Sequence, residues 1–186
     1  MVPLTQLWLP ILVAAVIVFA VSSIIHMFLT YHKNDVKAVP NEAAVGDALR
    51  GFDIPPGDYV MPCAASSAAM KSPEYQEKLA KGPVIFMTVI PKGPMTMGRS
   101  LVQWFVYCVV VGIFAAYVAG RALTPGAEYL AAFRFAGATA FAGYGLALLQ
   151  NSIWYRRGWG ATARGVFDAL IYAAVTGGAF GWLWPS

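Results

Sequence analysis

Four long apolar segments constrain this chain more than any other feature of its sequence. They run over Leu7–Leu29, Ser100–Ala119, Ala127–Leu149 and Gly165–Trp184. Each has roughly the 20 residues that a helix needs to cross about 30 Å of hydrocarbon. Of the 186 residues, 59% are hydrophobic and only 12% are charged, whereas charged residues make up about 25% of soluble domains. The sequence therefore predicts an all-α membrane protein with four transmembrane helices.

These segments divide the chain into three parts. Residues 1–30 are expected to form the first transmembrane helix. Residues 31–98 are expected to form a small cap between the first and second helices. Residues 99–186 are expected to form a three-helix transmembrane unit, with helices over 100–120, 125–149 and 164–184.

The polar segment 31–98 carries local signals of ordered structure. Asn41 is a favourable N-cap residue for a short helix that stops at Gly51. Ser72, followed by Pro and Glu, predicts a second helix over 73–81 that ends at Gly82. The apolar run 83–91 is too short to cross a bilayer, so it is either a strand paired with residues near 59–61 or a segment lying in the membrane interface. The cap is thus expected to hold short helices and a short strand pair.

Small residues recur every fourth position in the expected helices. Such a stripe lets another helix backbone approach closely, which drives helix association in a bilayer. The last helix carries Gly165, Ala169, Ala173, Gly177 and Gly181, and the second carries Gly112, Ala116 and Gly120. We interpret these residues as helix-packing positions. The first helix is richer in Leu, Ile and Val, so it is expected to be peripheral.

The distribution of Lys and Arg predicts an orientation, because these residues accumulate on the cytoplasmic side of membrane proteins. Residues 33, 37, 92 and 99, and residues 156, 157 and 164, are Lys or Arg near helix ends on one side. The other side has Arg121 alone. Residues 31–98 are therefore expected in the cytoplasm and both termini outside it.

Three ionisable residues within the apolar segments are candidates for a functional role: His26, Arg134 and Asp168. Charged groups in a bilayer are costly, so they pair, snorkel or line water. His26 is either an interfacial imidazole bonded to water, a Ser or a loop, or a ligand or proton relay. Arg134 is either a snorkelling or inter-helix residue or a contact for a substrate or lipid head group.

Asp168 lies in the first turns of the last helix. A carboxylate is favoured there by the helix dipole. We expect it to pair with one of the arginines at positions 156, 157 and 164.

No catalytic residues and no metal ligands are predicted. The only two histidines, His26 and His32, lie six residues apart on one segment, and a bis-histidine haem needs ligands from facing helices. Copper(I) could bind sulfur ligands at Met27, Met61, Cys63, Met95 and Met97, but Met also fills gaps in cores. No cofactor is therefore predicted, apart from lipid contacts, and pigment or haem in a partner is left open.

The net charge of +4 follows from residues beside helix ends. The sequence has no basic patch with interleaved aromatic residues, so nucleic-acid binding is not expected. The expected partners are membrane lipids and either other membrane subunits or further copies of the chain.

The sequence resembles a group of short, uncharacterised bacterial membrane proteins with four helices. The resemblance covers nearly the whole chain. It is carried by His26-Met27, Asn41-Glu42, Pro56–Tyr59, Met70–Pro73, Gly82-Pro83, Asn151–Trp154, Phe167-Asp168 and Gly181–Pro185. It implies four-helix architecture and a bacterial inner membrane, with no implied activity.

The small-residue stripes favour a non-enzymatic role, as an accessory or scaffold subunit that packs against itself or a larger membrane complex, with respiratory or photosynthetic complexes left open. The alternative is a small transporter or channel, which needs a polar path or broken helices. A membrane-bound enzyme or a copper-handling protein is the third hypothesis.

Overall fold

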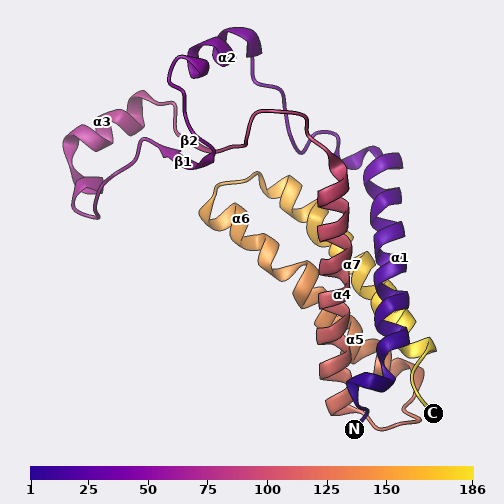
Figure 1. Ribbon diagram of the computed structural model, residues 1–186. Helices are drawn as coiled ribbons and strands as arrows, with labels where there is room; N and C mark the ends of the chain where they lie inside the picture. The colour runs from indigo at the N-terminus through magenta and orange to yellow at the C-terminus, as the bar shows by residue number, and fades with distance from the viewer. The chain divides into compact units, whose positions relative to one another are not determined.

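The computed structural model describes all 186 residues, which form two compact units. One unit comprises Met1–Val36 and Thr96–Ser186, and the other comprises Lys37–Met95. The first unit contains four longer helices, α1 (Trp8–Phe28), α4 (Met97–Ala122), α5 (Tyr129–Tyr144) and α7 (Trp159–Trp182) (Figure 1). Its shorter elements are η1 (Leu4–Gln6), η2 (Thr30–His32), η4 (Leu146–Leu148) and α6 (Leu149–Trp154).

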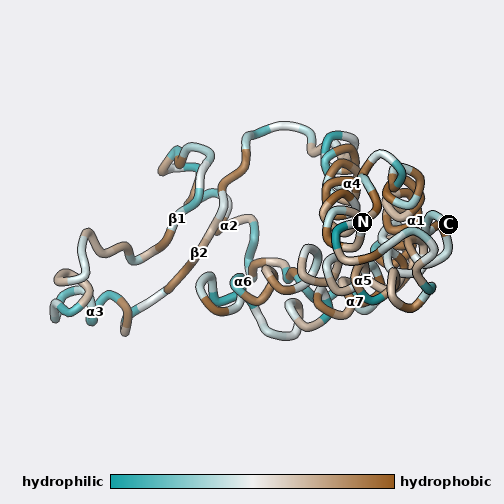
Figure 2. Tube along the Cα trace, turned by 90° about the horizontal axis from the view of Figure 1, so that it is seen from below, coloured by the Kyte–Doolittle hydropathy of each residue, from teal (hydrophilic) through white to brown (hydrophobic).

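Three helical segments are long and apolar enough to cross a membrane. They are Trp8–Phe28, Met97–Ala122 and Tyr129–Trp154, and hydrophobic residues dominate α1 and α4 (Figure 2). The fourth expected span is helical, as α7, but it is not one of the three. The structure therefore has three candidate spans, whereas the sequence predicts four.

The third span is interrupted, although the sequence predicts one helix over 125–149. Helix α5 begins only at Tyr129 and ends at Tyr144. Gly145 then has φ −113° and ψ −49°, and the chain continues through η4 and α6. A side chain of α4 bonds the helix at this point, because the Tyr107 hydroxyl donates to the carbonyl oxygen of Gly143 at 2.6 Å. The expected continuous helix is thus wrong at this end.

Helices α5 and α7 pack closely through small residues. An ideal Cβ at Gly177 would lie 2.7 Å from the carbonyl oxygen of Phe133, and one at Gly137 would lie 3.3 Å from that of Ala173. Along the stripe on α7, Ala169, Ala173 and Gly177 are buried, whereas Gly165 and Gly181 are partly exposed. Much of this face is therefore covered by α5 of the same chain.

Helix α4 places its small residues against the N-terminal part of the chain. Gly112, Ala116 and Gly120 are all buried. A Cβ at Gly112 would lie 3.2 Å from Ile11 of α1, and the N–H of Val2 donates to the carbonyl oxygen of Gly120 at 2.7 Å.

The expectation that the first helix is peripheral is wrong, because α1 packs against both α4 and α7. Its buried residues are Pro10, Ala14, Ala15, Val18, Ser22 and Ile25. Small residues in α1, as well as those in α4, thus allow the close packing.

The second unit contains short elements and no fully buried residue. Its elements are α2 (Glu42–Arg50), β1 (Gly57–Met61), η3 (Ala69–Lys71), α3 (Pro73–Lys81) and β2 (Ile85–Val89). The two strands are antiparallel, with Tyr59 opposite Met87. This confirms the strand alternative for the apolar run between the prolines.

The helix-capping predictions in this unit have different outcomes. Ser72 caps α3 as expected, since its hydroxyl accepts a hydrogen bond from the N–H of Tyr75 at 3.2 Å, and Gly82 ends the helix with φ 61°. Asn41 precedes α2 as expected, but it has left-handed backbone angles and its side chain makes no capping bond. The position of Asn41 before the helix is confirmed, whereas the expected side-chain hydrogen bond is absent.

Candidate functional site

A short polar segment directly after α1 brings ionisable side chains to α7. Leu29 ends the helix in an extended conformation, and the chain then turns through η2. The N–H of Asp35 donates to the carbonyl oxygen of His32 at 2.9 Å, which closes the turn. Tyr31, His32 and Asp35 are thereby displayed from one compact loop.

Asp168 of α7 accepts hydrogen bonds from this loop. Its Oδ2 lies 2.7 Å from Nε2 of His32, and its Oδ1 accepts from the Tyr31 hydroxyl. Asp168 is only 3% exposed, and a buried carboxylate needs such partners. The expected pairing of Asp168 with Arg156, Arg157 or Arg164 is therefore wrong.

The other ring nitrogen of His32, Nδ1, contacts a second carboxylate. Nδ1 of His32 lies 2.6 Å from Oδ2 of Asp35. Asp35 also accepts from Nε of Arg164 at 2.7 Å, and from its Nη2. Both ring nitrogens of His32 thus face carboxylate oxygens, and the Arg164 guanidinium faces one of the two carboxylates.

The pKa values in the loop reflect these contacts. The hydrogen bond from His32 holds the pKa of the Asp35 carboxyl below its usual value of 3.8, and Arg164 acts in the same direction. Burial, followed by the hydrogen bond to Asp168, raises the pKa of Tyr31 to about 12. Tyr31 is therefore a neutral hydrogen-bond donor at physiological pH.

His26 lies beside this network without belonging to it. Its ring centroid is 4.7 Å from that of His32. It is exposed and bonds to no Ser and no loop group, so water is the partner that remains of those expected for an interfacial imidazole. Three possible metal ligands come together here, because one ligand atom of His26, one of His32 and one of Asp168 all lie within 4.8 Å of one another. The two histidines converge because the chain turns at Leu29.

A cavity of about 500 Å³ adjoins these residues. One part of its lining is polar and the other is aromatic. The polar residues are His26, His32, Asp35, Asn151, Arg157, Thr162 and Asp168, and the aromatic ones are Trp104, Tyr107, Tyr144 and Tyr172. The lining comes from α1, α4, α5, α6 and α7 and the turns between them, all within one unit.

The aromatic part of the lining is a connected cluster. The ring centroid of Trp104 lies 5.6 Å from that of Tyr107, 6.0 Å from that of Tyr144 and 5.9 Å from that of Tyr172. Trp104 is fixed by a 2.8 Å hydrogen bond from its indole nitrogen to the Ser22 hydroxyl. The Tyr172 hydroxyl is buried and has no hydrogen-bond partner.

Of the three predicted ionisable candidates, the structure brings two together. His26 and Asp168 both line the cavity, whereas Arg134 is exposed on α5 and lies outside its lining. Sequence reasoning missed His32 and Asp35 as members of the site. The available signal was the clustering of five ionisable residues, including Tyr31 and Lys33, within ten positions at the end of one apolar segment.

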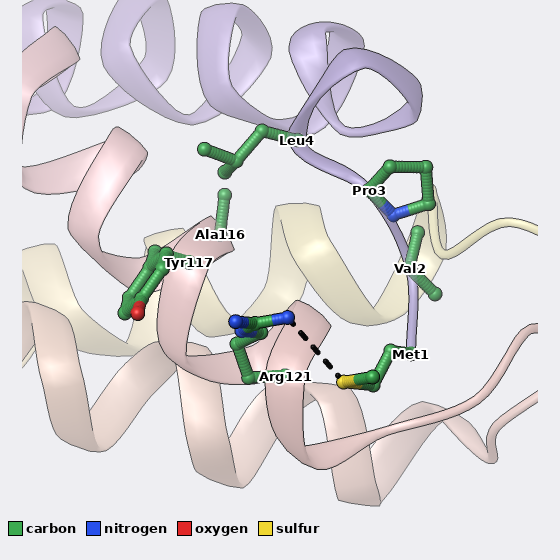
Figure 3. A pocket seen from close by; sticks show the side chains of 7 residues that line it. All are labelled: Met1, Val2, Pro3, Leu4, Ala116, Tyr117 and Arg121. Atoms are coloured by element: carbon green, nitrogen blue, oxygen red, sulfur yellow. Dashed lines mark hydrogen bonds between the residues drawn. The ribbon is translucent and has the colours of Figure 1, made fainter.

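A second pocket of about 320 Å³ lies between the N-terminal residues and α4 (Figure 3). It is lined by Met1, Val2, Pro3, Leu4, Ala116, Tyr117 and Arg121. The Arg121 guanidinium donates to the sulfur of Met1 at 3.5 Å and lies 5.9 Å from the Tyr117 ring centroid. Because its only ionisable side chains are one arginine and one tyrosine, this pocket offers less chemistry than the cavity.

Comparison of the chain with protein-family models, with curated proteins and with solved structures gave no match.

Proposed function

We propose that this chain is an integral membrane protein that binds an amphipathic molecule with an anionic head in the cavity beside His32. The observation that carries the proposal is a cavity lined both by members of a connected ionisable network and by members of a connected aromatic cluster. Ligand sites combine apolar walls with a few convergent polar groups in this way. A volume of about 500 Å³ is within the usual range for small molecules.

The charges of the lining favour an anionic head. Asp35 and Asp168 are both engaged by partners within the protein. Arg157 lines the same cavity and makes no ion pair. A carboxylate or phosphate would satisfy the guanidinium through paired hydrogen bonds.

The aromatic wall supports an apolar body for the same ligand. Trp104, Tyr107 and Tyr144 present large ring surfaces with polar edges, which suit the boundary between lipid and water. The buried and unpaired Tyr172 hydroxyl leaves a hydrogen-bonding group for a polar atom of the ligand.

Two earlier hypotheses bear differently on this proposal. The scaffold hypothesis rested on small-residue stripes, and their main partners are helices of the same chain. A transporter of the same amphiphile is the second candidate, because the interruption at Gly145 lies beside the cavity residues Tyr144 and Leu148, and broken spans are typical of transporters. The bacterial inner membrane and the cytoplasmic position of residues 31–98 remain part of the proposal.

Photocrosslinking tests the proposed binding. A fatty acid that carries a diazirine on its chain should label cavity residues in the full-length protein in detergent, as mapped by mass spectrometry of peptides. Ala161→Trp should fill the cavity and abolish the labelling. Ala163→Trp is the matched control, because Ala163 is exposed and lies outside the lining.

The charge of the head is tested by a second pair of variants. Arg157→Gln should weaken labelling by the fatty acid, whereas Arg156→Gln should not, because only Arg157 lines the cavity. The corresponding fatty alcohol should label weakly in all proteins. Equal labelling of Ala161→Trp and Ala163→Trp would contradict the proposal.

A further inference from the structure

We propose that His26, His32 and Asp168 form a binding site for one divalent first-row transition-metal ion such as Fe²⁺ or Zn²⁺. One ligand atom from each residue lies within 4.8 Å of the other two. Ligand atoms around a tetrahedral ion with bonds of about 2.0–2.1 Å are roughly 3.3–3.4 Å apart. Small side-chain rotations are therefore enough to bring the three atoms around one ion.

The surroundings of His32 suit a metal ligand. Metal-binding histidines usually donate their second ring N–H to a carboxylate, which fixes the tautomer and the ring. Asp35 is such an acceptor, 2.6 Å from Nδ1 of His32, and Arg164 holds Asp35 in place. This arrangement directs Nε2 of His32 toward Oδ2 of Asp168, so that an ion there would contact both atoms.

Asp168 and His26 meet the remaining requirements. The Tyr31 hydroxyl donates to Oδ1 of Asp168, which leaves Oδ2 facing His32. His26 makes no hydrogen bond, so its ring is free to turn toward an ion. Two imidazoles and one carboxylate are ligands that Fe²⁺ and Zn²⁺ accept, whereas Mg²⁺ and Ca²⁺ prefer oxygen ligands alone.

The bland interpretation is an ion-pair network that fastens the end of α1 to α7. It explains Tyr31, His32, Asp35, Asp168 and Arg164, since these residues bond to one another without an ion. It does not explain an unpaired histidine in ring contact with His32 at the wall of a cavity. His26 therefore separates the two interpretations.

Three protein ligands leave at least one coordination position open, as in catalytic rather than structural metal sites. A divalent ion at the cluster carries two positive charges and attracts an anionic oxygen to the open position. The head of the amphiphile is thus expected to occupy the open position, a step that rests on the proposed function, whereas metal binding itself does not.

Titration with Co²⁺ alone tests the metal site. The full chain, purified without a histidine tag and stripped with chelator, should bind one equivalent of Co²⁺ with visible d–d absorption, and Zn²⁺ should displace it. His26→Gln should weaken binding by roughly 10-fold or more, since even a lost outer-shell partner costs roughly 10–100-fold. Because His26 makes no hydrogen bond, this variant should fold normally, as helical circular dichroism would verify.

Two further variants complete the test. Asp35→Asn should reduce Co²⁺ affinity while retaining the absorption bands, because Asp35 positions His32 without touching the ion. The Glu128→Gln variant changes an exposed carboxyl outside the cluster, so it should bind Co²⁺ as the parent protein does. Lack of Co²⁺ binding by the folded parent, or unchanged affinity in His26→Gln, would show that the cluster is an ion-pair network only.

The amphiphile step has its own readout. Adding laurate to the Co²⁺-loaded protein should shift the d–d bands, and an unchanged spectrum would overturn that step alone. Fatty-acid crosslinking without Co²⁺ binding would remove the metal site and leave the proposed function standing. Co²⁺ binding without fatty-acid crosslinking would leave the metal site standing and remove the proposed function.

Discussion

Two neighbouring glycines of α7 allow a sharp test of how α5 and α7 pack. A Cβ at Gly177 would lie 2.7 Å from the carbonyl oxygen of Phe133 and 3.0 Å from Cδ2 of its ring. A Cβ at Gly178 would meet only the Tyr129 hydroxyl, at 3.6 Å. The first contact forces a backbone to move, and the second is an ordinary van der Waals distance.

The expected magnitude comes from the difference between the two alanine variants. Replacing Gly by Ala in a helix interior gains about 1 kcal/mol of helix propensity, and this gain is common to Gly177→Ala and Gly178→Ala. Overpacking a close contact costs about 1–3 kcal/mol, and only Gly177→Ala incurs it. Gly177→Ala should therefore be less stable than Gly178→Ala by about 1–3 kcal/mol, which corresponds to about 2–4 °C of Tm for each kcal/mol in a chain of this size.

Thermal unfolding of the two variants in the same detergent, followed by circular dichroism, measures this difference. Gly177→Leu and Gly178→Leu should show the same order with a larger gap, and Gly177→Leu should lose detergent stability first. Equal Tm values for Gly177→Ala and Gly178→Ala would refute the close approach of α7 to Phe133.

Three further predictions concern other parts of the chain. Ser72→Ala should cost about 1 kcal/mol of local stability, seen as faster amide exchange over residues 73–81 in α3. Contacts with His32 and Arg164 lower the pKa of Asp35 in the folded protein. The stability that Asp35 contributes is therefore present above its ordinary pKa of 3.8 and is lost as the pH falls through the lower folded pKa. Asp35→Asn should have a lower Tm at neutral pH and should lose less stability on acidification. A cysteine at Glu77, in a variant that lacks the exposed Cys63, should be shielded from an impermeant thiol reagent in intact cells; ready labelling would reverse the proposed orientation.

Features set by neighbouring residues could be predicted from the sequence. Ser72 and Pro73 begin α3 because a cap needs only a hydroxyl and a free N–H three residues on. The apolar segments are helical because backbone groups in a bilayer must bond within their own segment. The strand pair followed from the instability of a lone strand.

Features set by contacts between distant residues could not be predicted from the sequence. At the helix interruption, a Cβ on Gly145 would lie 3.0 Å from that of Ala169 in α7, and Tyr107 of α4 bonds to the carbonyl oxygen of Gly143. Asp168 bonds to Tyr31, which is 137 positions away, while the nearby arginines offered a local alternative. Sequence spacing placed His26 and His32 on one segment, but the turn at Leu29 that joins their rings depends on how the loop packs on α7.

The separation of Tyr31 and Asp168 along the chain also has a consequence for biosynthesis. The loop after α1 leaves the ribosome long before α7, so His32 and Asp35 wait beside the membrane without Asp168 and Arg164. During that interval His32 and Asp35 have each other as partners, and the groups that later face α7 are satisfied by water. Docking of α7 then supplies Asp168 and Arg164. A chain stalled before α7 would therefore keep an exposed, charged loop, a difference from the finished protein that membrane quality-control proteases could detect.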